Sequence, residues 1–386
     1  MSLDDEARAE LRELEAAHRL RTMRVVDGPQ GPHLTLDGAP VLNLASNDYL
    51  GLAADRRLAR AVAASLDEVG LGAGASRLIV GNHRAHHALE AALADWTRCP
   101  AARLFNSGYA ANTGVLSALA GPGDAIFSDE LNHASLIDGC RLSRADVTIF
   151  PHRDLPALEA ALARSTHRRR LVVSESLFSM DGDLADVTGL AALCARHGAA
   201  LVLDEAHAMG VLGPEGRGLA AARGVVPDIL IGTFGKALGT YGAFAATTRA
   251  IADLLWNRAR PLVFSTALPP ALAAATLASI EIVRGAEGDA RRRTLSAHAR
   301  RFRAAVPSTG GAAESPIVPI LIGDDRRTMA LTAQLLEERV FVQGIRPPTV
   351  PPGTARLRVG LSASLSDSEV ERAARALVNA MRQEAA

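Results

Sequence analysis

The feature that most constrains the fold is a series of short apolar runs between residues 46 and 270, separated by Ala/Leu-rich segments of helical period. Strands that alternate with helices pair in parallel, and such a sheet needs helices on both faces. The pattern therefore predicts an α/β domain built on a mostly parallel sheet. The runs are "ARLF", "AIFSD", "VTIF", "LVVSES", "ALVLDEAH", "DILIGTF" and "GAFAATT".

The flanking segments predict two further parts. Residues 1–45 read as an N-terminal arm, with an amphipathic helix followed by a turn and short strands, and residues 46–270 as the large domain. Residues 271–386 predict a smaller α+β C-terminal domain, with strands at "SPIVPILIG" and "ARLRVGLSAS" between helices. The uncharged run Pro261–Ile280 is Ala-rich and broken by two prolines. It is expected to be a buried loop and helix start, not a membrane span.

Composition excludes several classes of function. The 386 residues carry 42 basic and 42 acidic side chains, so no net charge attracts nucleic acid or an anionic membrane. Cys99, Cys140 and Cys194 are scattered, which matches neither a disulfide framework nor a metal site. The acidic, helical N-terminus does not resemble a signal peptide, so a cytoplasmic protein is expected.

Polar residues follow five of the predicted strands. Because ligands gather beyond the carboxyl ends of strands in α/β sheets, these residues are expected to share one site. Each has an ordinary alternative as a helix cap, a turn residue or a simple hydrogen-bonding partner. They are Gly108 and Tyr109 in a turn that opens a helix, His133, Ser179, Asp204 with His207, and Thr233 with Lys236.

Lys236 is the most informative of these residues. It lies in "TFGKALGTYG", among apolar side chains and glycines. A lysine on the protein surface would have charged neighbours instead. Desolvation favours the neutral amine, which attacks carbonyl groups to form a Schiff base. With a strand-end aspartate and a phosphate-ready turn, the set matches the requirements of pyridoxal phosphate (PLP).

Longer segments extend this match to a family. The chain resembles the α-oxoamine synthases, fold-type I PLP enzymes that join an amino acid to an acyl thioester with loss of carbon dioxide. The resemblance covers nearly the whole chain, in the family's order and spacing. The segments are "LASNDYLGL", "FNSGYAANTGVLSAL", "DELNHASLIDG", "ESLFSMDGD", "LVLDEAHAMGVLGPEGRG", "TFGKALGTYGAF", "FSTALPP" and "IRPPTVPPGTARLRVGLSA".

The resemblance implies roles for individual residues. Lys236 would be the Schiff-base lysine and Asp204 the partner of the ring nitrogen, with His133 stacked on the ring and His207 and Ser179 near its phenolic oxygen. Gly108, Tyr109 and Thr233 would hold the cofactor, and Ser265 or Thr266 would reach the phosphate of a neighbouring subunit in a homodimer. Substrate contacts are implied for Arg21, Asn47, His133, Arg346 and Thr349.

The resemblance also implies the substrates, because "IRPPTVP" is similar to the segment of members that use L-alanine and a pimeloyl thioester, carried by coenzyme A or by an acyl carrier protein. Arg346 suits the substrate carboxylate, since its planar fork forms two parallel hydrogen bonds. The alternative for this arginine is a surface position before a rigid turn. Other functions left open are a relative that uses glycine or serine (2-amino-3-ketobutyrate ligase, aminolevulinate synthase or serine palmitoyltransferase type), a noncatalytic subunit and a transaminase.

Three further segments contain no residue with a clear chemical role. The glycine-rich "GLGAGASR" lacks the third glycine of a dinucleotide-binding loop and is given no nucleotide role. Asn82, His83 and Arg84 are expected to border the acyl channel. The basic segment from Arg291 to Arg303 is interpreted as a solvated helix face rather than a contact for a carrier's phosphates.

Overall fold

The computed structural model describes residues 2–307 and 309–385. They form two compact units. The large unit comprises Leu50–Ser179 and Leu184–Arg293, and the small unit comprises Met1–Tyr49, Met180–Asp183 and Thr294–Ala386. The division into residues 1–45, 46–270 and 271–386 follows sequence pattern along the chain rather than contacts, and it stays a prediction.

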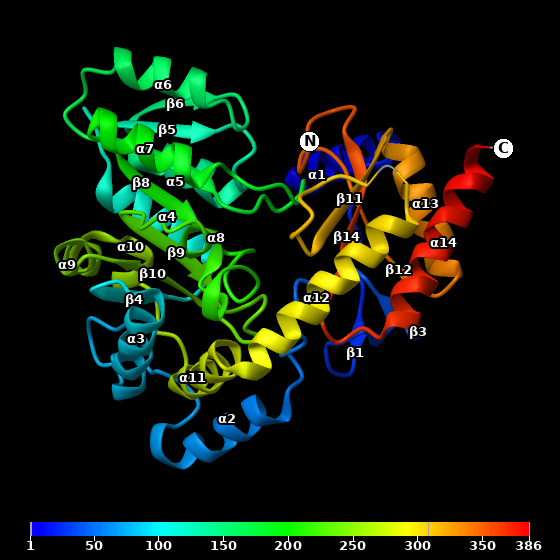
Figure 1. The fold of residues 1–386 in the computed structure, drawn as a ribbon, viewed down its shortest axis with the longest axis horizontal. Coiled ribbons are helices and arrows are strands. Elements are labelled where there is room, and N and C mark those ends of the chain that lie inside the picture. Colours follow the sequence, from blue (N-terminus) through cyan, green and yellow to red (C-terminus); the bar gives the residue numbers. More distant parts are fainter. Residues whose placement is uncertain (1, 308, 386) are drawn as a thin grey trace. The chain divides into compact units, whose positions relative to one another are not determined.

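The large unit contains a seven-stranded sheet in the order β4-β10-β9-β8-β7-β5-β6 (Figure 1). β10 is antiparallel to both of its neighbours, whereas all other adjacent pairs are parallel. The predicted mostly parallel α/β sheet is thereby confirmed. The strands are β4 (Ala101–Phe105), β5 (Ala125–Asp129), β6 (Asp146–Phe150), β7 (Arg170–Glu175), β8 (Ala200–Asp204), β9 (Ile229–Thr233) and β10 (Ala243–Thr247).

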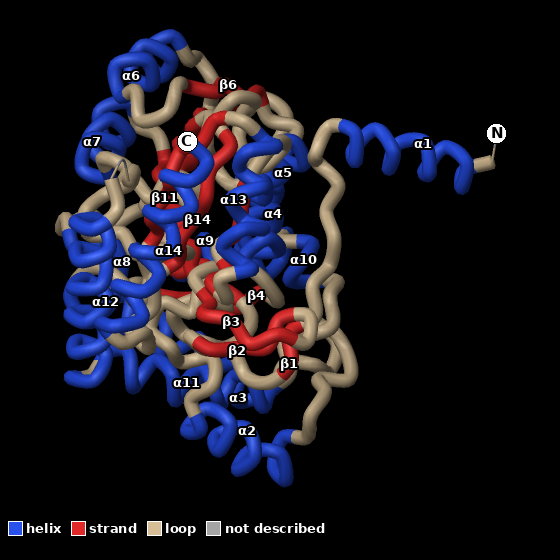
Figure 2. Tube along the Cα trace, turned by 90° about the vertical axis from the view of Figure 1, so that its right-hand side faces the viewer, coloured by secondary structure: helices blue, strands red, loops and turns tan. Residues whose placement is uncertain are grey.

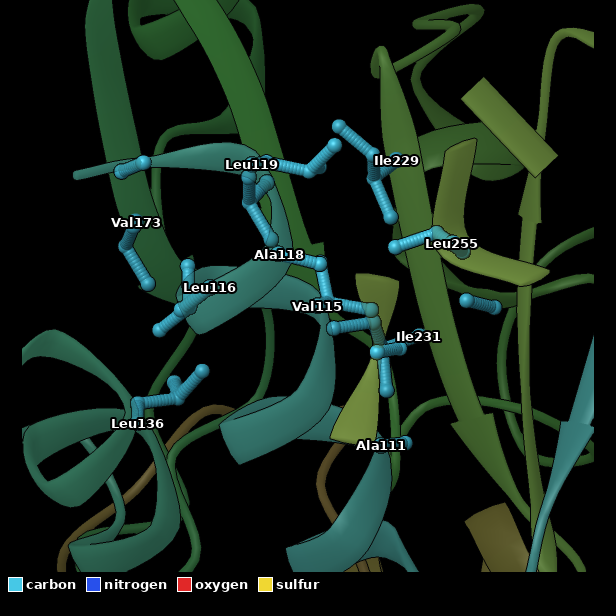
Figure 3. Packing of buried hydrophobic residues seen from close by; sticks show 14 of the residues in the cluster. Ala111, Val115, Leu116, Ala118, Leu119, Leu136, Val173, Ile229, Ile231 and Leu255 are labelled. Atoms are coloured by element: carbon cyan, nitrogen blue, oxygen red, sulfur yellow. The ribbon is translucent and has the colours of Figure 1, made fainter. Parts of the chain in front are cut away.

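Both faces of this sheet are covered, which explains why its strands are apolar throughout. Successive side chains of a strand point to opposite faces, so one strand serves two cores. In β7, Leu171 and Val173 pack in a cluster with α4, whereas Val172 packs in a second cluster with α6 and α7. Figure 3 shows the first cluster, in which Val115 and Leu116 of α4 lie against the sheet.

Side-chain caps fix where several helices of the large unit begin. Ser107, for example, accepts a hydrogen bond from the Ala110 N–H (3.1 Å) and starts α4 directly after β4. The helices are α2 (Arg56–Val69), α3 (Arg84–Thr97), α4 (Gly108–Leu119), α5 (Ala134–Ser143), α6 (Leu155–Arg164), α7 (Val187–His197), the 3₁₀ helix η1 (Pro214–Gly216), α8 (Gly218–Ala222), α9 (Arg249–Arg258), α10 (Arg260–Val263) and α11 (Pro270–Arg284). α12 (Ala286–Ala305) begins in the large unit and ends in the small unit.

The small unit contains two sheets, of order β1-β2-β3-β12 and β11-β14-β13. Its first helix, α1 (Leu3–Ala16), has no buried residue, and an extended segment joins it to β1 (Figure 2). The remaining elements are β1 (Val26–Asp27), β2 (His33–Leu36), β3 (Ala39–Asn43), β11 (Ile317–Gly323), α13 (Asp325–Glu337), β12 (Val340–Phe341), β13 (Gln343–Ile345), β14 (Ala355–Gly360) and α14 (Asp367–Ala385).

Two local expectations were wrong. The run Pro261–Ile280 contains the short helix α10 as well as the start of α11, and Phe264 within it is 67% exposed rather than buried. The basic part of α12 is not simply a solvated face. Arg292 donates to the carbonyl oxygens of Gly210 and Val283, and Arg303 donates to those of Ser315 and Ile317. Carbonyl groups without a backbone partner need donors when they are buried, and these arginines supply them.

Candidate active site

Lys236 lies in the loop after β9, where apolar packing and two glycines fix its position. Its neighbours Phe234, Ala237 and Leu238 are fully or almost fully buried, whereas Lys236 itself is half-buried. Gly239 has φ 65°, and a Cβ there would lie 2.4 Å from the Leu52 carbonyl carbon, so only glycine fits this turn. The Lys236 amine therefore lies at the edge of an apolar loop, as the sequence predicts.

The imidazole of His207 lies beside this amine. Its Nε2 lies 3.0 Å from Lys236 Nζ. The histidine is buried in the loop after β8, and that loop approaches the lysine loop closely. A Cβ on Gly210 would lie 2.8 Å from Ala237 Cβ, so glycine permits the contact. An amine and an imidazole at this distance can exchange a proton directly.

Asp204, the last residue of β8, places a carboxylate in the same region. It is 6% exposed, and its two oxygens accept hydrogen bonds from the Asn112 side-chain amide (2.7 Å) and the Ala206 N–H (2.8 Å). Donors on both oxygens stabilise a buried carboxylate in its charged form. Asp204 can thus present a fixed negative charge to a cationic group.

A chain of hydrogen bonds joins Asp204 to His133. Asn112 also donates to Ser135 Oγ (2.8 Å), which lies 2.7 Å from His133 Nδ1 at the start of α5. Desolvation lowers the pKa of His133, the Asp204 carboxylate opposes this change, and the Lys236 charge adds to it. The ring is consequently held by its Nδ1 side and is predominantly neutral at pH 7.

The turn for which phosphate binding is predicted opens α4, and its contact with phosphate stays a prediction. Gly108 and Tyr109 are the first two residues of α4, so their N–H groups have no partner within the helix. A Cβ on Gly108 would lie 3.9 Å from the Thr233 side chain, which brings the end of β9 next to this helix start. Ser179 is buried in the loop after β7, and its N–H donates to Glu175 (3.2 Å).

Ser265 and Thr266 lie in the loop between α10 and α11. The Thr266 carbonyl accepts a hydrogen bond from Asn106 (2.7 Å), the residue just before the Ser107 cap, so this loop borders the α4 turn. Their predicted contact with a neighbouring subunit stays a prediction. Asn82 and His83 have structural partners: Asn82 accepts hydrogen bonds from Arg77, and His83 caps α3. A role of these two residues at an acyl channel stays untested.

Three of the predicted substrate residues lie together in the small unit. Arg21, Arg346 and Thr349 line one cavity of about 520 Å³, and Arg21 Nη2 donates to Thr349 Oγ1 (3.1 Å). Asn47 does not line this cavity. Its Oδ1 accepts hydrogen bonds from Arg358 (3.0 Å) and from the Tyr49 hydroxyl (3.0 Å), which holds it within the same unit.

Arg346 is 8% exposed, so the alternative of a surface arginine is wrong. Its Nη2 donates to the Leu20 carbonyl (2.6 Å), whereas its Nε has no hydrogen-bond partner within the described chain. Burial lowers the pKa of Arg346, and Arg21 adds to this effect. A buried guanidinium with an unused donor favours an anionic ligand.

Sequence reasoning missed three members of the network, Glu175, Asn112 and Ser135. All three lie inside segments that were otherwise assigned, and Glu175 ends a strand just as Asp204 does. A second signal also went unused: Lys236 is the only lysine among the 42 basic residues of the chain. A position that alone keeps lysine in an arginine-rich chain requires an amine rather than only a positive charge.

Other kinds of site are not found in the part of the chain that the structure describes. Residues 2–307 and 309–385 contain no group of three or more His, Cys, Asp or Glu side chains arranged to hold a metal ion. Among the same residues, no helix has both the length and the apolarity that a membrane crossing needs.

Comparison with known proteins identifies the family. Residues 39–377 match the model of the aminotransferase class I and II family. An 8-amino-7-oxononanoate synthase from Marinobacter nauticus is 50% identical over 374 residues, which cover 95% of this chain and 94% of that protein.

Solved structures agree with this assignment. A serine palmitoyltransferase from S. paucimobilis, solved with bound PLP–myriocin aldimine, has a TM-score of 0.92 at 30% identity and covers 98% of this chain and 97% of its own. The 8-amino-7-oxononanoate synthase from Francisella tularensis has a TM-score of 0.77 at 28% identity, with 90% and 99% covered. The chain therefore belongs to the aminotransferase class I and II family and, within it, to the α-oxoamine synthases, which are fold-type I PLP enzymes.

Proposed function

We propose that the protein is a cytoplasmic 8-amino-7-oxononanoate synthase of biotin biosynthesis. It would condense L-alanine with a pimeloyl thioester of coenzyme A or acyl carrier protein, giving 8-amino-7-oxononanoate, carbon dioxide and the free thiol carrier. The observation that carries the proposal is the placement of the only lysine 3.0 Å from His207, in the large unit that also holds the buried Asp204 carboxylate at the end of β8. The 50% identity to the Marinobacter nauticus protein supports the choice within the family.

The residues present fit PLP. Lys236 offers an amine for the aldehyde, Asp204 an anion for the ring nitrogen, and the N–H groups of Gly108 and Tyr109 offer donors for the phosphate. Four more residues lie at or just after the carboxyl ends of strands in the same sheet and would complete the contacts with the cofactor: His133, Ser179, His207 and Thr233. When bound, PLP supplies an electron sink for the pair of electrons left when the α-proton of the amino acid is removed.

Side chains of the protein would transfer and hold the protons of the reaction. Lys236 Nζ, once free, is the base that takes the α-proton and later returns it, and the neighbouring His207 imidazole holds the amine in position. Asp204 would face the ring nitrogen, because Asn112 and Ala206 donate to its two oxygens and hold the carboxylate in place. His133, held through Ser135, would cover the reacting atoms and contact the substrate.

Arg346, Arg21, Thr349 and Asn47 are proposed to contact the substrates. The unpaired Nε of Arg346 supports a carboxylate ligand, since a bound anion would satisfy a donor that the folded chain leaves unused. Arg21 and Thr349 line the same cavity and would extend the polar surface. Asn47 is placed by its hydrogen bonds to Arg358 and Tyr49, and its substrate contact depends on the family resemblance.

A homodimer with shared active sites is also proposed. The large unit exposes apolar side chains that a monomer would leave in water: Ile79 is 69%, Val80 77% and Phe264 67% exposed. Phe264 directly precedes Ser265 and Thr266, the residues expected to reach a neighbouring subunit. Burial of these side chains against a second copy would place that loop at the interface.

A relative that uses serine is the main alternative, because the structural similarity to serine palmitoyltransferase is high. Sequence identity of 50% against 30% favours the alanine-using enzyme, since closer relatives share substrates more often than the fold alone implies.

Two assays test the proposed function. Spectral titration of the PLP-loaded protein with alanine, glycine and serine should give the tightest binding for alanine. Thiol release with pimeloyl thioesters of each carrier should then depend on alanine. Release that depends instead on glycine or serine would overturn the assignment.

A further inference from the structure

A second carboxylate lies beside Asp204, and the chemistry proposed above does not use it. Glu175 ends β7, and it is the register partner of Asp204 on the adjacent parallel strand β8. Neighbouring residues in register on parallel strands project to the same face of the sheet. The two acidic side chains are 2% and 6% exposed. Two charges of the same sign cannot both be buried at such short range without a large cost in free energy.

The hydrogen-bond donors are divided unequally between the two carboxyl groups. Asp204 has donors on both oxygens, including the Asn112 amide at 2.7 Å. Glu175 accepts a hydrogen bond from the Ser179 N–H (3.2 Å) and faces the backbone N–H of His133, and its Oε1 has no hydrogen-bond partner among the described residues. The carboxylate with more hydrogen-bond donors, Asp204, keeps the negative charge, and Glu175 is more stable as a neutral acid.

We propose that Glu175 is a positioning residue that stays protonated in the folded protein, so that the single negative charge of the pair resides on Asp204. Its neutral carboxyl group also fixes the backbones of His133 and Ser179, which lie on two different loops of the site. Because Glu175 is almost fully buried, it acts through these neighbours and not by touching substrate.

The charges around Glu175 agree with this assignment. Desolvation, with a further contribution from the Asp204 carboxylate, raises the pKa of Glu175 to about 8, although Lys236 and two backbone N–H groups oppose the change. The charged groups that act on it are Asp204 and Lys236, and His133 faces it through its backbone N–H. The inference rests on the proposed function only for the role of Asp204 at the cofactor ring. The protonation of Glu175 is a property of the folded chain.

Infrared difference spectroscopy of the PLP-loaded, full-length protein tests the protonation. At pH 7 the wild type should show a carboxylic-acid carbonyl band that Glu175→Gln lacks, and this band should disappear as the pH is raised through about 8. Glu205 is a second buried acid, whose pKa desolvation raises to about 7, so Glu205→Gln identifies its separate band. A pH 7 spectrum in which Glu175→Gln removes only a carboxylate band would overturn the proposal.

The absorbance of the lysine-bound cofactor tests the effect on charge. If Glu175 is neutral, Glu175→Gln leaves the pH midpoint of this absorbance within about 0.5 units of the wild type. If Glu175 is ionised, the same variant removes a negative charge near Lys236 and lowers the midpoint by about one unit or more. The second result would contradict the proposal even if turnover were retained.

A third variant tests the positioning. Glu175→Leu removes the acceptor for the His133 and Ser179 N–H groups and should weaken PLP binding about tenfold or more relative to Glu175→Gln, measured by equilibrium titration. Equal affinity of the two variants would reject this role. Glu130→Gln is the matched control, since Glu130 directly follows β5 but lies outside the pair, and it should change neither the band nor the midpoint.

Discussion

The strand-end cluster in the large unit and the arginine-lined cavity in the small unit are built by opposite strategies. Around Lys236, the charged groups face protein partners: His207 lies beside the amine, and Asn112 links Asp204 to Ser135 and His133. In the cavity, the buried Arg346 keeps a donor without a partner. The first region is held by hydrogen bonds within the protein, whereas the second has a donor that a bound anion would satisfy. The difference predicts that mutations in the two regions act on different steps.

The largest effect is expected for Lys236→Ala. Removal of the only lysine removes both the covalent attachment and the base, so turnover should fall on the order of 10⁴-fold or more, while PLP still binds noncovalently. Steady-state thiol release measures this loss. Lys236→Arg is the matched control because it restores the charge without a nucleophile; recovery of turnover in that variant would mean that charge alone is needed.

Asp204→Asn should have the next largest effect. The amide is isosteric but cannot keep a proton on the ring nitrogen, so exchange of the α-proton of alanine should slow by about 100- to 1,000-fold. Loss of deuterium from labelled alanine, followed by NMR, measures the rate. Asp204→Glu retains the charge and should keep part of the exchange. Unchanged exchange in Asp204→Asn would contradict the proposed role of Asp204 at the ring nitrogen.

Arg346→Lys tests the cavity. Lysine keeps the charge but loses the planar fork, so KM for alanine should rise by about 10- to 100-fold while the absorbance of the lysine-bound cofactor stays unchanged. The comparison between the regions fails if this variant instead loses the cofactor and retains its affinity for alanine.

Arg21→Gln should have the smallest effect. Arg21 is exposed and donates a hydrogen bond to Thr349, so the change in kcat/KM should be less than about fivefold. Arg24 lines the same cavity but pairs with Asp37, and Arg24→Gln provides the control. A loss of more than about 100-fold in Arg21→Gln, without a loss in the control, would place Arg21 among the main substrate contacts.

The sequence predicted the sheet and its strand ends because apolar runs and the residues that follow them are local signals. Asp204, His207 and Lys236 were found in this way, as was the turn at Gly108. The hydrogen-bond and strand partners of these residues could not be predicted from local signals. The link from Asn112 to Asp204 spans 92 positions, and the pairing of Glu175 with Asp204 depends on the register of two strands. The contacts of Arg292 and Arg303 likewise depend on which carbonyl groups the fold leaves unpaired.

The most direct test is reduction of the PLP-loaded protein with borohydride, followed by peptide mass spectrometry. Because the chain has a single lysine, the side-chain amine that can retain the cofactor is that of residue 236. The account predicts one added cofactor mass per chain, on the peptide that contains Lys236, and none on that peptide's counterpart in Lys236→Ala. A loaded protein that shows no such mass on this peptide after reduction would contradict it.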